Sequence, residues 1–482
     1  MSTPRRQIVV MKFGGTSVED ADAIRRTTAI VAGRRRKGLS PIVVVSAMAR
    51  VTDTLLAAAA ASGRNAREEA LQLSDSLRTR HLNTAAELFT NSGGHGDRLN
   101  LLQLNIHHEF DALDDLLRGI AAVGELTARS SDNVVSFGER ISSLLVSAAF
   151  LEQSLPSVHV DARTVIFTDS HHGKAAPQEE AIRVALLERV LPLVERRQVP
   201  VMGGFIGSCN GITTTLGRGG SDYTGALVGG GLHAGAIEIW TDVDGIMTAD
   251  PRIVPEALRV KTISFEEAAE LAYFGAKVLH PATILPAVQK NIPVHVLNSR
   301  NAENEGTRIT ATPPPCSSPF KSIAVKKKLT IIDIVASRML LAHGFLKSIF
   351  DVFDKHQCAI DMVSTSEISV SVTVDSREAL PAICTELRKI ADVKYEGNKA
   401  LVCLVGEDIR GQAGISGQVF SSISHINVRM ISQGASEINM SFMIEEDDAD
   451  EAVRSLHAAF FKDPDPAVFD VEARKQLLAS RS

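Results

Sequence analysis

Short apolar runs alternate with longer helical stretches over the first 300 residues of the chain. These runs are rich in β-branched residues and have the length of buried strands. They are IVVMKF (8–13), PIVVVSAM (41–48), VHV (158–160), VPVMGGF (199–205), AIEIW (236–240) and IPVHVL (292–297). Strands that alternate with helices predict a mainly parallel sheet covered by helices on both faces, a three-layer α/β/α sandwich.

An internal repeat follows the proline-rich stretch TPPPCSSP (312–319), which we interpret as a linker. The segments SEISVSVTV (366–374) and SEINMSFMI (436–444) lie 70 residues apart, and each follows an apolar helical stretch and a short strand. In the first copy Ile368 and every second residue after it are apolar, which predicts a strand with one buried face. A duplicated pair of small α/β modules after a larger α/β domain indicates a catalytic unit with a regulatory tail.

Composition excludes several classes of protein. The net charge is -6, with 51 Lys and Arg against 57 Asp and Glu, which argues against a nucleic-acid partner. The five cysteines are scattered without a CxxC pair, as in reduced cytoplasmic proteins. The N-terminus MSTPRRQIVV has no long apolar region, and no stretch approaches 18 apolar residues, so we expect neither secretion nor membrane insertion.

Two glycine-rich segments predict a site for anions. Lys12 and Phe13 end the first apolar run and are followed at once by Gly-Gly-Thr-Ser, while TTTLGRGGSDYTGAL (213–227) places Arg218 among three glycines. Glycines let backbone N–H groups approach a phosphate closely, and a guanidinium group suits a phosphate or a carboxylate. Neither GxxxxGK[ST] nor GxGxxG occurs at these points. For the segment KFGG alone, a lysine at a strand edge with no ligand is an equally good interpretation. The prediction of an anion site therefore depends on both glycine-rich segments sharing one cleft.

The chain resembles the aspartate kinases of the amino-acid kinase superfamily over about residues 8–460. The resemblance is carried by an ordered set of motifs: KFGGTS (12–17), VVVSAM (43–48), SFGERIS (136–142), TTTLGRGGSDYTGA (213–226), WTDVDGIMTADPR (240–252) and FGAKVLHPAT (274–283). It implies a monofunctional enzyme whose domains are an amino-acid kinase domain (1–311), a linker (312–322), two regulatory βαββαβ-type ACT domains (323–400 and 401–465) and a C-terminal extension (466–482). A strand that precedes the first ACT domain is expected to be available to complete the sheet of the second ACT domain.

The resemblance implies transfer of the γ-phosphoryl group of ATP to the side-chain carboxylate of L-aspartate, with Mg²⁺, as the first step of lysine, threonine and methionine biosynthesis. A carboxylate nucleophile carries no proton, so positioning and charge neutralisation suffice without a general base. The implied catalytic residues are Lys12, which bridges the phosphates, and Asp222, which orients it. The implied aspartate-binding residues are Ser46, Thr52, Glu139 for the ammonium, Arg218 for the α-carboxylate, and Ser221. The implied ATP-binding residues are Lys12, Gly14, Gly15, Ser17, Thr241, Asp242, Met247, Arg252 and Lys277. The protein ligands of the metal are left unidentified.

The resemblance also implies an amino-acid effector site in the ACT domains. Its expected residues are Met339, Gly344, Phe345, Leu346, Asp361, Thr365, Ser366 and Glu367, with Asp361 facing the effector's ammonium. Lysine is the first candidate effector and threonine the second. Leu341 and Ala342 stand where lysine-inhibited relatives have a His-Ser pair. The free edges of the ACT strands suggest a homodimer or homotetramer.

This chain departs from the family pattern in its kinase domain at two points. Met247 stands where many relatives have a tyrosine, and relatives commonly have a glycine near Ala49 and Arg50, so we expect a less free backbone there. Two alternatives are a related amino-acid kinase, for glutamate or N-acetylglutamate, and a non-catalytic amino-acid sensor that kept the fold.

Overall fold

The computed structural model describes residues 7–90, 96–275, 284–335, 344–375 and 378–472. The chain divides into two compact units, which are considered separately. Unit 1 comprises residues 1–246 and 278–313, and unit 2 comprises residues 247–277 and 314–482. Residues 247–277, inside the range 1–311 predicted for the kinase domain, therefore cluster with the C-terminal unit.

Unit 1 is built on a mainly parallel sheet whose central strand is β1 (Ile8–Phe13), between β2 (Ser40–Val45) and β7 (Ala236–Thr241). All six residues of β1 are buried, as expected for a strand with helices on both faces. The strand order is β3-β4-β2-β1-β7-β9-β10, and β10 is antiparallel to β9. The other bounds are Ser157–Val160 for β3, Val199–Gly203 for β4, Val294–Asn298 for β9 and Thr307–Thr310 for β10.

The two-residue period of β1 sorts its side chains between two helical layers. Val9, Met11 and Phe13 join a core cluster with residues of α1 (Ala21–Arg36) and α5 (Ala128–Glu152). Val10 and Lys12 face the opposite layer, where Gly229 and Gly225 of α8 (Gly220–Leu232) lie against them. These contacts confirm the predicted α/β/α sandwich.

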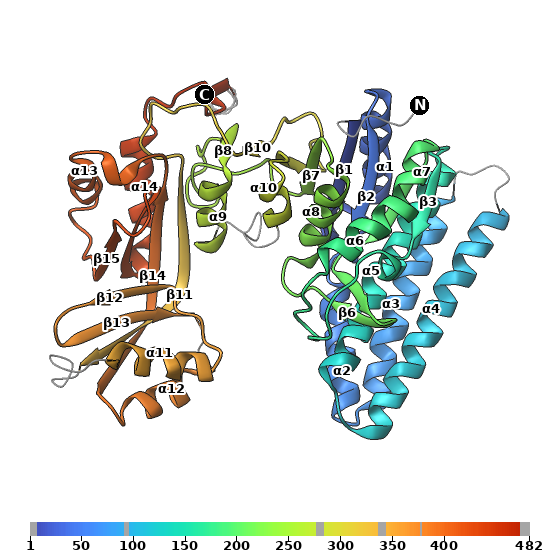
Figure 1. Cartoon of the computed structure of the whole chain (residues 1–482), viewed down its shortest axis with the longest axis horizontal. Coiled ribbons are helices and arrows are strands. Elements are labelled where there is room, and N and C mark those ends of the chain that lie inside the picture. The colour runs from blue at the N-terminus through green and yellow to red at the C-terminus, as the bar shows by residue number, and fades with distance from the viewer. Residues whose placement is uncertain (1–6, 91–95, 276–283, 336–343, 376–377, 473–482) are drawn as a thin grey trace. The chain divides into compact units, whose positions relative to one another are not determined.

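The remaining helices of unit 1 complete the two layers. Helices α2 to α5 pack against one another (Figure 1). The bounds are Val51–Gly63 for α2, Arg67–Leu88 for α3, Gly96–Val123 for α4, Glu179–Ala185 for α6, Leu191–Glu195 for α7 and Leu285–Gln289 for α10. Short turns of helix occupy Gly15–Ser17, Ala162–Thr164 and Leu186–Val190. Helix α5 is long and apolar enough to cross a membrane, but 78% of its most apolar 18-residue segment is buried inside the protein, as in the core helix of a globular domain.

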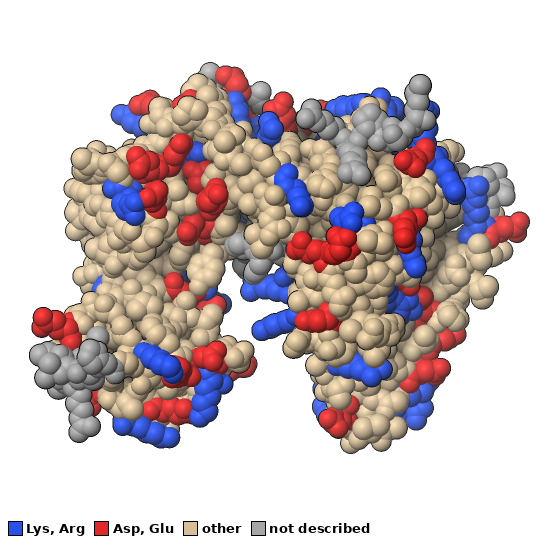
Figure 2. Space-filling view, viewed as in Figure 1, with Lys and Arg blue, Asp and Glu red and all other residues tan. Residues whose placement is uncertain are grey.

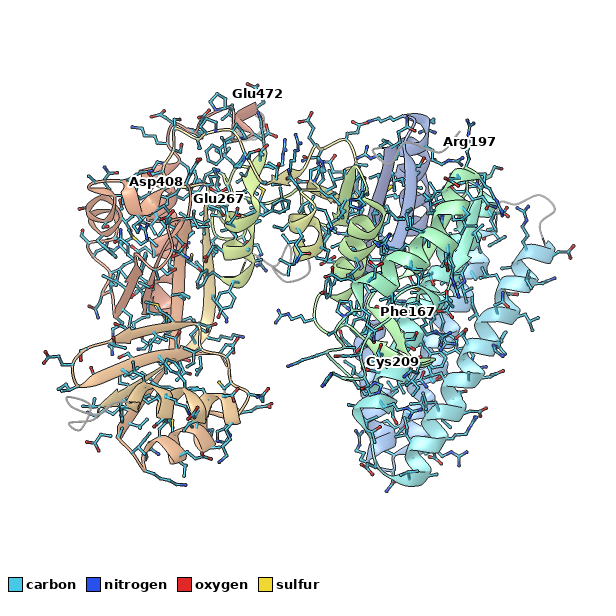
Figure 3. All side chains as sticks on the ribbon, in the orientation of Figure 1. Phe167, Arg197, Cys209, Glu267, Asp408 and Glu472 are labelled. Atoms are coloured by element: carbon cyan, nitrogen blue, oxygen red, sulfur yellow. The ribbon has the colours of Figure 1, made fainter. Side chains whose placement is uncertain are left out.

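A separate hairpin of unit 1 leads into the second glycine-rich segment. Strand β5 (Ile206–Cys209) pairs with β6 (Ile212–Thr215) in an antiparallel ribbon, and Figure 3 shows Cys209 at its tip. The chain then turns through Gly217 and Gly219, both with positive φ, into α8. Only glycine adopts these turns without strain, which explains the glycine pattern seen in the sequence.

Unit 2 contains a second, antiparallel sheet that unites the two repeats. Its order is β12-β13-β11-β14-β16-β15, and the repeats appear as α11-β12-β13 and α13-β15-β16. The central strands are β11 (Ser322–Val335) and β14 (Asp392–Val405). The other bounds are Met362–Thr365 for β12, Ser369–Val374 for β13, Met430–Gln433 for β15, Asn439–Glu445 for β16, Phe345–Lys355 for α11, Leu380–Leu387 for α12, Ile415–Ser422 for α13 and Ala449–Phe460 for α14. Strand β8 (Thr262–Ser264) and α9 (Phe265–Tyr273) precede this sheet in the chain, and short 3₁₀ turns occupy Ile409–Gly411 and Glu446–Asp448.

One detail of the repeat was predicted wrongly. Ile368 was expected on the buried face of its strand, but it lies just before β13 and is 44% exposed. Ser366 forms a turn with Ser369, and this turn carries Ile368 out of the alternating pattern.

Charge is mixed on the face of each unit that Figure 2 shows. On the face drawn in Figure 2, acidic and basic side chains are interspersed, with no continuous basic area. This mixture agrees with the composition of the chain.

Candidate active site

A cavity of about 560 Å³ opens in unit 1, where β1, β2 and β4 end. It brings together eight of the predicted residues: Lys12, Gly15, Ser46, Thr52, Glu139, Arg218, Ser221 and Asp222. The remaining lining residues are Ala47, Met48, Ala49, Arg50, Asp53, Phe205, Gly217, Gly219 and Gly220. Ligands of open α/β sheets bind beyond the carboxyl ends of the strands, so this is the expected place for a substrate.

Lys12 and Asp222 form an ion pair at the floor of this cavity. Lys12 Nζ lies 2.7 Å from Asp222 Oδ1, and the two side chains are only 11% and 15% exposed. Gly225 lies one turn beyond Asp222 on α8, where a Cβ atom would approach Lys12 Cβ to 3.4 Å, so the glycine lets the helix pack closely on the lysine. Asp222 occupies the first turn of α8, where the helix dipole favours a negative charge.

Glu139 lies buried on the inner side of the cavity. Its Oε1 accepts a hydrogen bond from Ala47 N at 3.2 Å, and the residue is 4% exposed. Gly203 stands directly behind it, because a Cβ there would come within 2.9 Å of Glu139 Cβ. Burial raises the pKa of Glu139 to about 8, against the smaller opposing effects of the Ala47 hydrogen bond and the Lys12 charge. A carboxyl with this pKa is mostly protonated at neutral pH.

The segment that follows β2 forms one wall of the cavity and is fixed by hydrogen bonds. Ser46 N donates to Phe13 O, and Ala49 N donates to Gly15 O at 3.2 Å. Ser142 Oγ donates to Ser46 O, and Arg80 Nη1 donates to Ala49 O at 2.8 Å. Arg50 adopts a left-handed backbone with a φ of 67°.

Asp132 is a supporting residue that sequence reasoning missed. It is 3% exposed, and its carboxylate accepts hydrogen bonds from Thr215 Oγ1 at 2.6 Å, Thr215 N at 3.2 Å and Gly173 N at 3.0 Å. His172 Nδ1 lies 2.8 Å from the same carboxylate. Asp132 thus holds the end of β6, from which the glycine turn with Arg218 departs. The sequence does contain one signal for this role: Asp132 lies on α5 two turns before Glu139, and therefore on the same face of the helix.

Of the predicted nucleotide-binding residues, Lys12 and Gly15 line this cavity, whereas Gly14, Ser17, Thr241 and Asp242 of the same unit do not. Gly14 N donates to Trp240 O, and Ser17 Oγ donates to Ser299 Oγ at 2.8 Å. Thr241 ends β7 and donates to the Asp242 carboxylate next to it.

Two further nucleotide-binding predictions belong to unit 2. Arg252 pairs with Asp250 at 2.6 Å and is 90% exposed, and the Met247 carbonyl accepts a hydrogen bond from Ser322 Oγ. Lys277 lies outside the described residues.

The predicted effector residues lie in unit 2. Gly344 caps α11 with a φ of 87°, and Phe345 and Leu346 open that helix. Thr365 ends β12, and Ser366 and Glu367 follow it in an exposed turn. Met339, Leu341 and Ala342 lie outside the described residues.

Asp361 already has a cationic partner within the chain. Lys326 Nζ lies 2.7 Å from Asp361 Oδ1 and 3.0 Å from Asp375 Oδ2. Desolvation raises the pKa of Asp361, and the Lys326 ammonium opposes that rise. An effector amine that paired with Asp361 would compete with Lys326.

Comparisons with known proteins place this site in a class of enzymes. The sequence model of the amino acid kinase family matches residues 7–298, and that of the ACT domain matches residues 332–385 and 402–460. Fold and cavity together thus define an amino-acid kinase with ACT domains.

The relatives narrow this class. Lysine-sensitive aspartokinase 3 of Escherichia coli is 37% identical over 95% of this chain and 100% of its own, and the chloroplastic aspartokinase 1 of Arabidopsis thaliana is 36% identical over 96% of this chain and 82% of its own. The crystal structure of E. coli aspartokinase III in complex with aspartate and ADP superposes with a TM-score of 0.81 at 35% identity, covering 94% of this chain and 100% of that one. The chain belongs to the aspartokinase family, and the enzyme is an aspartate kinase.

Proposed function

We propose that the cavity of unit 1 is where the γ-phosphoryl group of ATP passes to the side-chain carboxylate of L-aspartate. The γ-phosphorus exchanges its bond to the bridging oxygen of ADP for a bond to a carboxylate oxygen, and ADP leaves with the electron pair. The products are ADP and 4-phospho-L-aspartate, an acyl phosphate at the start of lysine, threonine and methionine synthesis. The observation that carries the proposal is the shared cavity of the Lys12–Asp222 pair, Glu139 and Arg218.

In this proposal each charged side chain has one task. Lys12 Nζ neutralises the phosphoryl oxygens, and Asp222 holds Lys12 in place at 2.7 Å. Arg218 binds the α-carboxylate of aspartate, and Glu139, once ionised, accepts its ammonium. Ser46, Thr52 and Ser221 add hydroxyl groups to the substrate side of the cavity. Nucleotide binding is assigned to Gly14, Gly15, Ser17, Thr241, Asp242, Met247, Arg252 and Lys277.

The site suits Mg²⁺ carried in by the nucleotide. Mg²⁺ in kinase sites is held by one or two carboxylates together with substrate phosphates and water. Asp222 and Asp53 supply carboxylates to the cavity, and no cluster of three or more metal-binding side chains occurs within the described ranges. When bound, the ion neutralises phosphate charge, while Asp222 orients Lys12.

For regulation we propose feedback by an amino acid at the ACT repeat, with lysine before threonine. A crystal structure of E. coli aspartokinase III holds lysine and aspartate, and it superposes with a TM-score of 0.79 at 36% identity. In this chain Asp361 is the proposed ammonium partner, with Met339, Gly344, Phe345, Leu346, Thr365, Ser366 and Glu367 around the effector. A cytoplasmic homodimer or homotetramer, joined through the ACT strands, completes the proposal.

The decisive experiment measures ADP release with ATP, Mg²⁺ and one amino-acid acceptor at a time. Aspartate should support turnover, whereas glutamate and N-acetylglutamate should not. Lys12→Ala should lower kcat by at least about a hundredfold, because one charge-stabilising donor is lost from the transition state. Lys290→Ala, at an exposed lysine that ends α10, is the matched control and should keep the wild-type rate. Turnover with another acceptor, or a normal rate for Lys12→Ala, would contradict the proposal.

A further inference from the structure

A short segment near the end of the chain, residues 465–470, is built into unit 2. Lys261 N donates to Val468 O at 2.7 Å, and Asp470 N donates to Arg259 O at 2.9 Å. The residues between these two hydrogen bonds form an antiparallel bridge. This C-terminal segment lies beyond the last residue that the sequence model of the ACT domain matches, so the family pattern assigns it no role.

Side chains also anchor the C-terminal segment. Val468 and Phe469 are fully buried, and the ring of Phe469 packs edge-on against that of Phe461, with centroids 5.7 Å apart. Asp470 Oδ2 lies 2.6 Å from Arg259 Nη2, and these two side chains are 20% and 8% exposed. A pair so largely removed from water is sensitive to the loss of either partner, because the remaining charge stays buried.

The partner of the C-terminal segment is one end of a closed loop that runs from Met247 to Arg259. These two residues form an antiparallel bridge. Next to them, Thr248 N donates to Leu258 O, and Leu258 N donates to Thr248 Oγ1, each at 2.8 Å. Arg252 lies inside this 247–259 loop and is 90% exposed. The loop thus carries two of the residues assigned to nucleotide binding, Met247 and Arg252.

The first end of the 247–259 loop is fixed by the ACT sheet. Ser322 Oγ donates to Met247 O at 2.7 Å, and Ile323 N donates to Thr248 O at 2.8 Å, both from β11. Thr248 Oγ1 also lies 2.9 Å from His457 Nε2 of α14. One end of the loop is therefore held by β11 and α14, and the other end is held by the C-terminal segment.

We propose that the C-terminal segment positions the 247–259 loop for nucleotide binding, with Asp470 as a positioning residue that acts through Arg259. The proposal rests on the proposed nucleotide-binding roles of Met247 and Arg252. A loop held in its binding geometry loses less conformational freedom when the ligand arrives, and it therefore binds more tightly. Without the Asp470 carboxylate, the second end of the loop loses its ion pair, and binding of ATP must restore the order that the pair supplied.

The first test measures binding of MgADP to the full-length protein by isothermal titration calorimetry. Asp470→Ala should raise the Kd for MgADP about tenfold, because a misplaced contact loses most of its contribution. Asp470→Glu keeps the carboxylate and should recover most of the affinity. Glu451→Ala is the matched control, because Glu451 pairs with His425 in the same unit through side chains that are 58% and 50% exposed. Loss of this exposed pair should leave the Kd at the wild-type value.

Kinetics and hydrogen exchange separate positioning from a general loss of structure. In Asp470→Ala the KM for ATP should rise about tenfold, whereas kcat and the KM for aspartate should stay within about twofold of the wild type. The amides of Thr248 and Leu258 should exchange faster in this variant, because the loop opens more often. The amides of β14 should keep their wild-type protection.

Two results would overturn the proposal. One is an unchanged Kd for MgADP in Asp470→Ala, whether or not the loop exchanges faster. The other is an equal rise of both KM values together with lost protection in β14, which would mean that Asp470 only stabilises unit 2. Absence of MgADP binding by the wild-type protein would instead contradict the proposed function, and hydrogen exchange would still report whether Asp470 fixes the loop.

Discussion

Binding of aspartate should release a proton from Glu139. In the free enzyme, burial raises the pKa of this carboxyl to about 8, so roughly nine in ten molecules carry the proton at pH 7. In the proposed function the substrate ammonium pairs with the ionised form of Glu139, so its arrival should lower this pKa. About 0.9 proton should therefore leave for each aspartate bound at pH 7.

The same shift sets the sign and size of the pH dependence. Below pH 8 the proton must be removed before the ammonium pairs with the carboxylate, so affinity weakens as the pH falls. The Kd for aspartate should rise about tenfold from pH 7 to pH 6, which corresponds to about 1.4 kcal/mol. Above pH 8 the affinity should level off, because Glu139 is then already ionised.

Isothermal titration calorimetry in two buffers of different ionisation enthalpy measures this proton directly. The observed heat should differ between the buffers by about 0.9 of the difference in their ionisation enthalpies. Succinate, which lacks the ammonium, is the control ligand and should release no proton from Glu139. Buffer-independent heat for aspartate, or the same heat in Glu139→Gln, would refute the reasoning.

Three further outcomes are expected. Asp132→Asn should raise the KM for aspartate about tenfold, because the substitution loosens the turn that carries Arg218. The KM for ATP should change by less than about twofold. Equal changes in the two KM values would indicate a general loss of structure. Lys321→Met should lower the free energy of unfolding of unit 2 by about 3–5 kcal/mol in urea titrations. The reason is that the Glu267 carboxylate, whose side chain is 2% exposed, loses the ammonium that lies 2.9 Å away. The double variant with Glu267→Gln should regain most of the lost stability, and no regain would argue against the pair. Asp361→Ala should weaken inhibition by the effector and spare the uninhibited rate, and an unchanged inhibition curve would place the effector elsewhere.

The parts of the site that follow from contiguous sequence were predictable. Lys12 ends a β-branched run, and the two-residue period of a strand puts it on the face that α8 covers. The glycines at 217 and 219 signal a turn with positive φ, and the turn delivers Arg218 and Asp222 to the same cavity. The repeat in the C-terminal part was equally visible, because SEISVSVTV and SEINMSFMI lie 70 residues apart. In the structure, α11 and α13 both begin after glycines with nearly equal φ.

The parts that depend on distant partners were not predictable. Asp132 finds its donors 41 and 83 residues further along the chain, and no local pattern marks such a pairing. The pairing of Lys326, inside β11, with Asp361, just before β12, joins residues that the sequence separates by a whole helix, α11. The left-handed backbone of Arg50 follows Ala49, which is hydrogen-bonded to Gly15 and Arg80, and no propensity of arginine indicates it.

The long strands of unit 2 determine whether the ACT region can be cut into fragments that keep their sheet intact. The C-terminal half of β11 pairs with β13 of the first repeat, and its N-terminal half pairs with the end of β14, which in turn pairs with β16 of the second. A truncation anywhere between the repeats would strip each half of a central strand and expose its core. A fragment designed for ligand screening must therefore keep β11 and β14 together, from before Ser322 through α14.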